Sequence, residues 1–239
     1  MAGPLTLGSF ALLGGAGAAL GVIHPNSPLF GRVISRGSRR ERVAYLTFDD
    51  GPNPRATPAI LDTLAETSVP AAFFLVGRHV ERFPGLAIRA HEAGHELANH
   101  TSDHRRLLWC GPRTVAEAIE TAHAQIGKAV GAVPRAFRAP YGMRNPFVPG
   151  VTRRLGYATF GWSITAWDWR RPGAEIIRRR VARALHPGAI ILLHDGDGTD
   201  PTGDRSQTAA ALPGIIQDAR EQGYRFGALG ELLPAEAAG

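Results

Sequence analysis

The chain has 239 residues, of which 44% are hydrophobic and 20% are charged, which predicts one globular domain with a sizeable core. Its net charge is +6, and we interpret this excess either as Arg-rich codon use or as attraction to an anionic cell wall or lipid surface. Nucleic acid is not expected as a partner, because no basic stripe is interleaved with aromatic residues. Cys110 is the only cysteine, which excludes an intramolecular disulfide and a paired-thiolate metal site.

The first 41 residues are expected to lie outside the catalytic domain. Residues 5–23 carry no charge and are long enough for a candidate membrane anchor, although five glycines weaken that interpretation. The segment is a poor match to a signal peptide, because no basic residue precedes it. Residues 24–41 are expected to be a linker, since prolines and glycines alternate there with polar residues.

The location of the protein stays open at this point. Arginines follow the hydrophobic segment, and the positive-inside rule then favours a cytoplasmic domain. That conflicts with a wall polymer as substrate, so we expect a membrane-anchored or extracytoplasmic protein without excluding the cytoplasm. The expected domains are residues 1–41 as hydrophobic segment and linker, 42–233 as catalytic domain and 234–239 as a C-terminal tail.

From residue 42 onward, short apolar runs alternate with amphipathic segments, which predicts alternating strands and helices. The expected strands are residues 43–48, 71–76, 96–99, 136–138, 157–164, 189–193 and 224–227. The expected helices are 56–67, 79–93 with a break near Pro84, 114–130, 146–155, 174–185 and 208–222. Thr114 is expected to cap its helix, with Glu117 completing a capping box. Strands separated by helices predict a largely parallel sheet in a closed or nearly closed barrel.

Two adjacent carboxylates, Asp49 and Asp50, end the first predicted strand, and Gly51-Pro52 follows at once. Parallel α/β sheets and barrels place their chemistry at the carboxyl ends of the strands. Successive strand residues point to opposite sides, so the two carboxylates can do different work. By itself such a pair is commonly a solvated turn, and its interpretation depends on residues further along the chain.

Four later motifs supply those residues: His100-Thr101-Ser102-Asp103-His104, Arg138-Ala139-Pro140-Tyr141-Gly142, Trp167-Asp168-Trp169 and Leu192-Leu193-His194-Asp195. In this order and spacing, and together with Asp49-Asp50, they resemble the polysaccharide deacetylase family, also called the NodB-homology or carbohydrate esterase family four proteins. The resemblance extends from Arg42 to Leu233. It implies a single domain folded as a distorted (β/α) barrel with about seven parallel strands.

The resemblance also implies a metal site formed by Asp50, His100 and His104. The two histidines are four residues apart, a spacing that can place both rings on one face. Two imidazoles and one carboxylate leave coordination positions open for water, as in catalytic zinc sites. Zinc is the expected metal, while cobalt, nickel, manganese and iron suit the same ligands. Thr101 is expected to hold the ligand loop by hydrogen bonds.

The family pattern assigns the proton-transfer groups as well. It implies that Asp49 is the general base on water activated by the metal, paired with Arg138, which keeps the carboxylate charged and aimed. It implies that His194 is the general acid for the leaving amine, and that Asp168 keeps His194 protonated.

Three features are expected around the reacting atoms. A backbone N–H beside Tyr141, which follows Pro140, is expected to help hold the oxyanion. Leu192 and Trp169 are expected to form the walls of a pocket for the acetyl methyl group. The acidic residues after the last motif are interpreted as a solvated loop at the rim of the site, and they are Asp195, Asp197, Asp200 and Asp204.

The function that these motifs imply is removal of N-acetyl groups from glycans containing N-acetylglucosamine, such as chitin oligomers or peptidoglycan, by a monomer. An O-deacetylase of the xylan type and a cyclic amidase need the same hydrated metal and acid, so both stay open. A non-catalytic glycan-binding relative is the remaining alternative. Such a protein is expected to have lost the base or the acid, whereas Asp49 and His194 are both present here.

Overall fold

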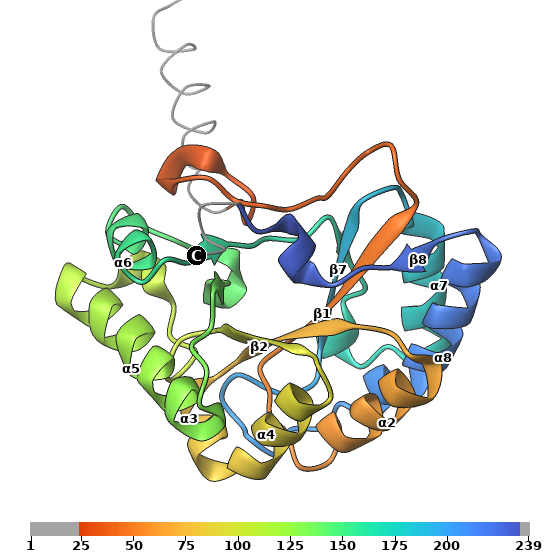
Figure 1. The fold of residues 1–239 in the computed structure, drawn as a ribbon, viewed down its shortest axis with the longest axis horizontal. Coiled ribbons are helices and arrows are strands. Elements are labelled where there is room, and N and C mark those ends of the chain that lie inside the picture. Colours follow the sequence, from red (N-terminus) through yellow and green to blue (C-terminus); the bar gives the residue numbers. More distant parts are fainter. Residues whose placement is uncertain (1–23, 235–239) are drawn as a thin grey trace, which may run out of the picture.

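The computed structural model describes residues 24–234 (Figure 1). The strands are β1 (Val43–Asp49), β2 (Ala71–Leu75), β3 (Glu96–Asn99), β4 (Ala136–Phe137), β5 (Ala158–Thr159), β6 (Ile164–Thr165), β7 (Ala189–His194) and β8 (Arg225–Phe226). The helices are α2 (Thr57–Thr67), α3 (Gly77–Arg82), α4 (Pro84–Glu92), α5 (Pro112–Val130), α6 (Val148–Arg154), α7 (Ala174–Ala184) and α8 (Ser206–Glu221).

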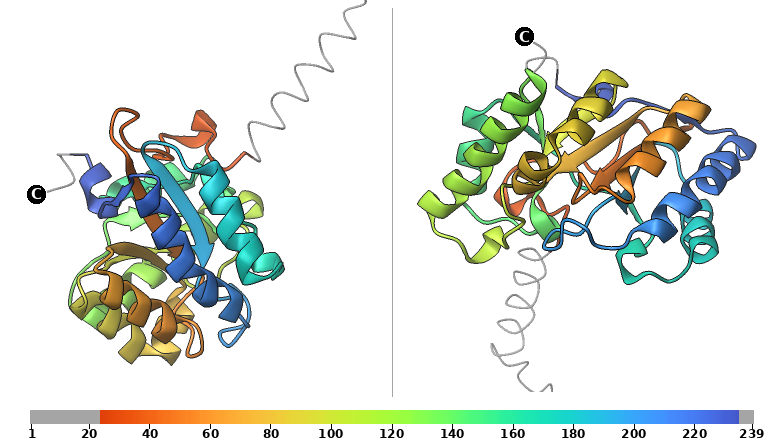
Figure 2. Two further views of the ribbon diagram at one scale, coloured as in Figure 1. Left: turned by 90° about the vertical axis from the view of Figure 1, so that its right-hand side faces the viewer. Right: turned by 90° about the horizontal axis from the view of Figure 1, so that it is seen from below.

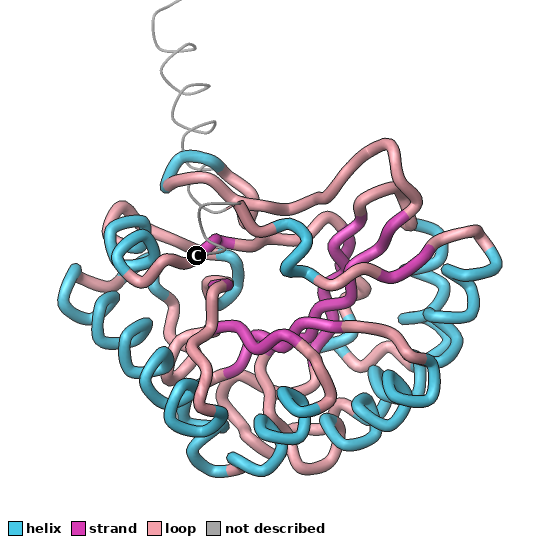
Figure 3. The backbone as a smooth tube through the Cα atoms, in the orientation of Figure 1, coloured by secondary structure: helices cyan, strands magenta, loops and turns pink. Residues whose placement is uncertain are grey.

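The strands form one curved parallel sheet in the order β5-β4-β3-β2-β1-β7-β6, and β8 pairs with β1 outside this path. The helices lie on the outer side of the curve, while loops cross the remaining side (Figure 3). Two further views show the same arrangement from the side and from below (Figure 2). The predicted α/β distorted barrel with about seven strands in a single domain is therefore confirmed.

Strand β1 lies at the centre of the sheet and is buried along its whole length. Its residues alternate between two apolar layers, as the pleat requires. Leu46 and Phe48 pack in the layer that contains the inner faces of α2 and α8, whereas Val43 and Tyr45 pack in the layer inside the barrel. Asp49 continues the inward series, so its carboxylate is directed into the barrel rather than toward the helices.

The predicted strand over residues 157–164 is wrong in one respect, because it is two short strands at opposite edges of the sheet. Strand β5 pairs with β4, and β6 pairs with β7. The chain must cross the opening between these edges, so residues 160–163 leave the pairing with β4 and join the pairing with β7. Their backbone N–H groups bond to three different segments: Phe160 to Phe137, Gly161 to Ile34 and Ser163 to Ile190.

Residues 24–41, which we call the strap, close this opening, and their interpretation as a linker is corrected. Ile34 forms a parallel bridge with Phe160, and Arg36 forms an antiparallel bridge with Ala189. The buried guanidinium of Arg144 donates hydrogen bonds to three strap carbonyls, those of Ser27, Phe30 and Gly31. Pro- and Gly-rich composition suggested a free linker, but here it gives an irregular segment whose polar groups bond to the barrel.

The predicted helices are all present, but their starts differ from the prediction by up to two residues, and one predicted cap is wrong. The break at Pro84 is confirmed, since α3 and α4 meet there. Helix α5, however, begins at Pro112 after Gly111 and has no side-chain cap, so the capping role of Thr114 is wrong. The fixed φ of proline suits the first helical turn and starts the helix two residues earlier.

Across residues 24–234, no helix combines the length and the apolar character needed to cross a bilayer. The candidate anchor at residues 5–23 lies outside the described residues and stays a prediction.

Candidate metal centre and active site

Because all the strands of the barrel are parallel, their carboxyl ends meet at one rim, and the predicted site residues gather there. Asp49 ends β1 and Asp50 follows it; His194 ends β7. His100 comes directly after β3, and Arg138 directly after β4. Asp168 lies in the turn after β6. The ends of five strands, β1, β3, β4, β6 and β7, thus bring the motifs together.

Asp50, His100 and His104 form a compact buried cluster whose candidate ligand atoms all lie within 4.8 Å of one another. The Nε2 atoms of His104 and His100 lie 3.0 and 3.4 Å from Oδ1 of Asp50. Within residues 24–234 this is the only group of three or more acidic, His or Cys side chains with such geometry.

The polar atoms of this cluster are arranged for a cation. Oδ1 of Asp50 is buried without a hydrogen-bond partner among the described residues, and it faces the Nε2 atoms of both histidines. Nδ1 of His100 lies 2.7 Å from the carbonyl of Arg138, so it carries the proton and leaves Nε2 with a free lone pair. Burial raises the pKa of Asp50, but the adjacent imidazoles of His104 and His100 outweigh burial and hold that pKa well below its usual range. The donor set therefore fits a divalent metal ion.

The loop that carries both histidines is held by Thr101 and Asn99. The Thr101 N–H donates to Oδ1 of Asn99 at 2.8 Å, and the Thr101 hydroxyl accepts from the N–H of His104 at 3.1 Å. Asn99 in turn donates from Nδ2 to the carbonyl of Ile119 on α5 at 2.8 Å. Asn99 was not predicted as a site residue, and its place directly before the first histidine was the available signal.

Backbone strain is concentrated at this rim. Of the non-glycine residues with positive φ, five lie in the predicted motifs, and they are Asp50, Thr101, His104, Tyr141 and Trp167. Each such conformation costs about 1–3 kcal/mol and persists only where the surroundings over-determine it. Strain of this kind clusters at functional sites, so its distribution independently marks the same residues.

Among residues 24–234, only one oxygen of the Asp49 carboxylate accepts a hydrogen bond. Arg138 is fully buried, and its guanidinium donates to Oδ1 of Asp49 at 2.6 Å, to the hydroxyl of Thr47 at 2.9 Å and to the carbonyl of Gly161 at 2.8 Å. The same guanidinium lies 4.0 Å from the ring centre of Phe74. Burial lowers the pKa of Arg138, and the ion pair with Asp49 opposes that effect. The second oxygen, Oδ2, lies 3.7 Å from Nε2 of His100, on the side of the metal cluster.

His194 and Asp168 form the second half of the site. Nδ1 of His194 lies 2.9 Å from Oδ1 of Asp168, while Oδ2 accepts from the His194 N–H at 2.7 Å and from the Thr208 hydroxyl at 2.9 Å. Burial lowers the pKa of His194, but the charge and hydrogen bond of Asp168, with the charges of Asp50 and Asp49, raise it to about 9. Burial raises the pKa of Asp168, and its interactions with His194 and Thr208 lower it overall.

The expected pocket walls occupy the same rim. Tyr141 is partly exposed, and its ring centre lies 4.8 Å from that of His104; Pro140 beside it is buried. Leu192 is 5% exposed on β7, whereas Trp169 is 45% exposed in the turn that also carries Asp168. The rings of Trp167 and Trp169 are 6.2 Å apart, with Arg170 against both.

One residue of the predicted solvated loop is misassigned. Asp195 is fully buried, and its Oδ2 accepts from the hydroxyl of Thr57 at 2.6 Å. Burial, opposed by the Thr57 hydrogen bond and reinforced by the charges of Asp50 and Asp49, raises the pKa of Asp195 to about 7. The carboxyl group of Asp195 packs against Gly51, where a Cβ would overlap it. Asp195 thus contacts and supports the turn after β1.

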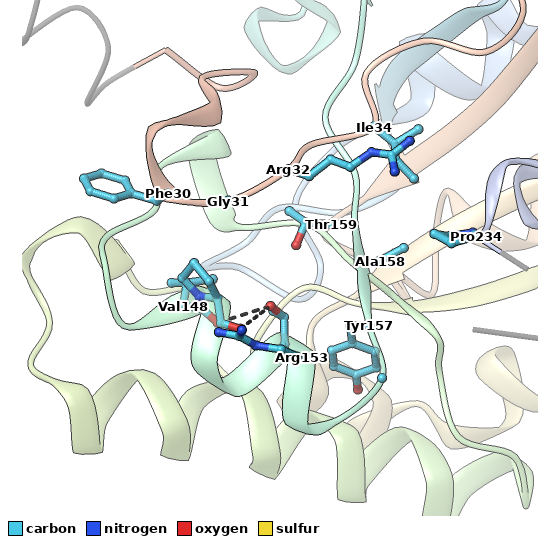
Figure 4. Close-up of a pocket in the computed structure, with 13 residues that line it drawn as sticks. Phe30, Gly31, Arg32, Ile34, Val148, Arg153, Tyr157, Ala158, Thr159 and Pro234 are labelled. Carbon is cyan, nitrogen blue, oxygen red and sulfur yellow. Dashed lines mark hydrogen bonds between the residues drawn. The ribbon is translucent and has the colours of Figure 1, made fainter. Parts of the chain in front are cut away.

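A separate groove of about 500 Å³ lies between the strap, α6 and the start of β5 (Figure 4). Figure 4 shows Phe30, Val148 and Tyr157 around it, with hydrogen bonds that stay within α6. None of the motif residues lines this groove, and its residues form no acid, base or metal-ligand group. It is therefore distinct from the candidate active site.

The fold and the site together define a barrel protein with a buried Asp-His-His cluster, an Arg-bound carboxylate and a His-Asp pair. A sequence model described as polysaccharide deacetylase matches residues 36–160. The chain belongs to the polysaccharide deacetylase family. A chitooligosaccharide deacetylase from Bradyrhizobium sp. (strain ANU 289) is 42% identical over 199 residues, which is 80% of this chain and 90% of that protein.

Solved structures give the same family. The Bc1960 peptidoglycan N-acetylglucosamine deacetylase is similar with a TM-score of 0.79 and 29% identity, covering 84% of this chain and 92% of that one. BA3943 from Bacillus anthracis, described as a pseudoenzyme of carbohydrate esterase family four, has a TM-score of 0.76 and 30% identity, covering 84% and 68%. The family thus includes proteins without activity, so function has to be argued from the residues of the site.

Proposed function

We propose that this protein is a metal-dependent hydrolase that removes N-acetyl groups from glycans containing N-acetylglucosamine. The single observation that carries the proposal is the arrangement around Asp49. One of its oxygens is fixed by Arg138, and the other is on the side of the Asp50, His100 and His104 cluster. A carboxylate that is aimed and half free in this way is suited to accept a proton from an attacking water.

Asp50, His100 and His104 would hold a divalent ion such as zinc, which would lower the pKa of a water and polarise the acetyl carbonyl. The protein's own groups then divide the remaining work. Asp49 Oδ2 takes the proton of the water, and the buried Arg138 keeps the base oriented while the reaction proceeds. Cobalt, nickel and manganese suit the same ligands, and we propose zinc as the native metal.

His194 has the properties required of the general acid. Amide hydrolysis needs a proton on the leaving nitrogen, and the raised pKa of His194, about 9, keeps the ring protonated at neutral pH. Asp168 holds Nδ1, so Nε2 is the nitrogen available to donate that proton to the substrate. The backbone N–H beside Tyr141 is proposed to help hold the oxyanion, and Leu192 and Trp169 to enclose the acetyl methyl group.

A non-catalytic glycan-binding role is disfavoured by the same residues. A protein that only binds glycan has no need for a buried Arg-carboxylate pair, because a buried ion pair is weak support for stability. The side chains proposed as base, acid and metal ligands are all present, and contacts with Arg138 and Asp168 orient the proposed base and acid. O-acetylated xylan and small cyclic amides require the same water and acid, so they remain the alternative substrates.

The substrate proposal follows from the relatives, which are named for chitooligosaccharides and for peptidoglycan N-acetylglucosamine. We further propose a monomer that is membrane-anchored through residues 5–23 or extracytoplasmic. The decisive measurements use the zinc-loaded protein: release of acetate from chitooligosaccharides, peptidoglycan fragments and acetylxylan, and ring opening of cyclic amides, which release no acetate. Release from the first two only, with free amine as the second product, supports the proposal. Acetate from acetylxylan alone, or no turnover of any substrate, would contradict it.

A further inference from the structure

Helix α3 begins directly beside the loop that carries the two histidines of the metal cluster. The N–H of Gly77 donates to the carbonyl of Thr101, and the N–H of Arg78 donates to the carbonyl of Ser102, both at 2.9 Å. Those carbonyls lie between His100 and His104 in the chain. The first residues of α3 therefore hold the histidine loop in place through its backbone.

The side chain of His79 reaches the third metal ligand. His79 is 1% exposed, and its Nδ1 lies 2.8 Å from the backbone carbonyl of Asp50. A carbonyl oxygen can only accept, so Nδ1 carries the hydrogen. Burial lowers the pKa of His79, which agrees with a neutral ring. Asp50 has a φ of 77°, a conformation that non-glycine residues rarely adopt, and this hydrogen bond is one of the contacts that hold it.

The side chain of Arg78 supports His104 from the opposite side. Its Nη2 donates to the carbonyls of Gly198 and Thr199 at 2.6 and 3.2 Å. Gly198 packs so tightly against His104 that a Cβ at this position would overlap the imidazole ring. An ion pair at 2.9 Å between Asp197 and Arg205 ties down the same loop. Through these bonds Arg78 helps to hold Gly198 in contact with the His104 ring.

We infer that Arg78 and His79 are positioning residues that set the metal affinity of the site, His79 by fixing Asp50 and Arg78 by confining His104. The inference rests on the metal site of the proposed function. It is separate from the family motifs, because neither residue lies in any of them. The alternative for His79 is an ordinary buried histidine, but His95, which is also buried, has no hydrogen-bond partner on either ring nitrogen within residues 24–234. By contrast, the ring N–H of His79 donates to the backbone carbonyl of Asp50, a proposed metal ligand.

Groups that orient metal ligands typically change metal affinity by about ten- to a hundredfold when removed. His79→Leu keeps the apolar volume and removes the donor, so its zinc dissociation constant is expected to rise by about that factor. His79→Asn is the rescue variant, because the amide nitrogen of asparagine occupies nearly the place of Nδ1 and can donate to the same carbonyl. It should bind zinc close to the wild-type affinity. His95→Leu is the matched control for loss of a buried histidine and should leave zinc affinity unchanged.

Arg78 offers a second, independent variant at an exposed position. Arg78→Met keeps the aliphatic stem and removes the two hydrogen bonds to the 198–199 carbonyls. Its control is Arg82→Met on the same helix, whose guanidinium lies over the ring of Phe83, 5.5 Å from its centre. Arg78→Met is expected to weaken zinc binding several-fold, near the lower end of the about ten- to a hundredfold effect of groups that orient metal ligands. Arg82→Met is expected to leave the zinc affinity unchanged.

The test is competition for zinc between the full chain and a chromophoric chelator, with folding followed by circular dichroism. Turnover at saturating zinc is measured alongside, and His79→Leu should recover a near wild-type kcat there, since His79 orients a ligand and takes no part in proton transfer. Wild-type affinity in both folded His79→Leu and folded Arg78→Met would overturn the inference, as would equal losses in His79→Leu and His95→Leu. If His79→Leu does not fold, Arg78→Met against Arg82→Met decides. A wild-type chain that binds no zinc would instead overturn the proposed metal site itself.

Discussion

The two halves of the candidate site differ in how complete they are without a ligand. In the Asp50, His100 and His104 cluster, Oδ1 of Asp50 is buried without a hydrogen-bond partner among residues 24–234, and the backbone is strained at Asp50 and His104. In the His194–Asp168 pair, both carboxylate oxygens of Asp168 are bonded, one of them twice. Unmade polar interactions in a buried place are costly, and they persist where an absent group supplies the missing contacts. The Asp50, His100 and His104 cluster therefore needs a ligand to complete its polar contacts, whereas the His194–Asp168 pair needs only the proton that the two residues share.

The largest expected effect comes from breaking the ligand-dependent half. Removal of metal by a strong chelator, or the change His100→Ala, is expected to abolish turnover, because both the water and the acetyl carbonyl depend on the cation. Zinc or cobalt should restore the chelated wild type, while His100→Ala should show a parallel loss of bound metal and rate. The measurements are metal content by atomic emission and acetate release. Full turnover in a preparation shown to be metal-free would rule out the metal-dependent mechanism.

The next prediction separates the two adjacent carboxylates. Asp49→Asn keeps the shape and the neighbouring metal ligands, but an amide cannot take the water's proton at neutral pH. The single-turnover rate should fall by about a hundred- to ten-thousand-fold, the usual contribution of a general base, while zinc content stays near wild type. Asp50→Asn should lose zinc first and activity as a consequence. Equal metal loss in both variants would mean that both carboxylates are ligands, and the base would lie elsewhere.

A smaller and differently shaped effect is expected from the proton-dependent half. Asp168→Asn removes the charge that raises the pKa of His194, so that pKa falls and the ring loses its proton at lower pH. Since the acid must be protonated, the alkaline limb of the kcat/KM profile should move to lower pH. In the wild type this limb is expected at or below about 9, because a cation at Asp50 offsets part of that carboxylate's contribution.

Profiles recorded at saturating zinc, with metal content checked at each pH, test this shift. His194→Ala is the companion variant: it should keep zinc, lose rate at every pH and show no limb from this group. An alkaline limb that is unchanged in Asp168→Asn would mean that it reports another group, and the assignment of His194 as the acid would fail.

The smallest effect on chemistry is expected from the strap, which lies outside both halves. A chain that begins at residue 24 should match the full chain in kcat, because all the proposed site residues lie between Asp49 and His194. A chain that begins at residue 39 loses the three carbonyls that accept from the buried Arg144, and a stranded buried donor of this kind costs about 1–3 kcal/mol.

Urea unfolding of the two shortened chains compares these cases. We expect a lower midpoint for the chain that begins at residue 39, with a modest change in kcat, since the N–H of Gly161 donates to Ile34 of the strap while the carbonyl of Gly161 accepts from Arg138. Equal midpoints would mean that the strap contributes nothing to stability and serves as the linker that its composition suggested.

Part of this protein could be predicted from local patterns alone. Apolar runs such as Val43–Asp49 and the amphipathic helix Pro112–Val130 depend on near neighbours in the chain, so their presence was predictable while their ends were not. The site motifs were predictable for a related reason. Metal binding and proton transfer require particular side chains at strand ends. Those side chains form short sequence motifs, such as Asp49-Asp50, that can be recognised without the structure.

Other features depend on which distant segments meet, and the tertiary structure alone decided them. The strap has the composition of a linker, yet it forms bridges with Phe160 after β5 and with Ala189 of β7, because those backbone groups need hydrogen-bond partners. Asp195 belongs to an acidic run, yet the packing of Gly51 and Thr57 around it removes it from solvent. His79 resembles any helical histidine until the fold sets its ring against the carbonyl of Asp50. The sequence alone predicts the side chains that can bind a metal or transfer a proton. The residues that hold those side chains in place can be identified only from tertiary contacts between segments far apart in the chain.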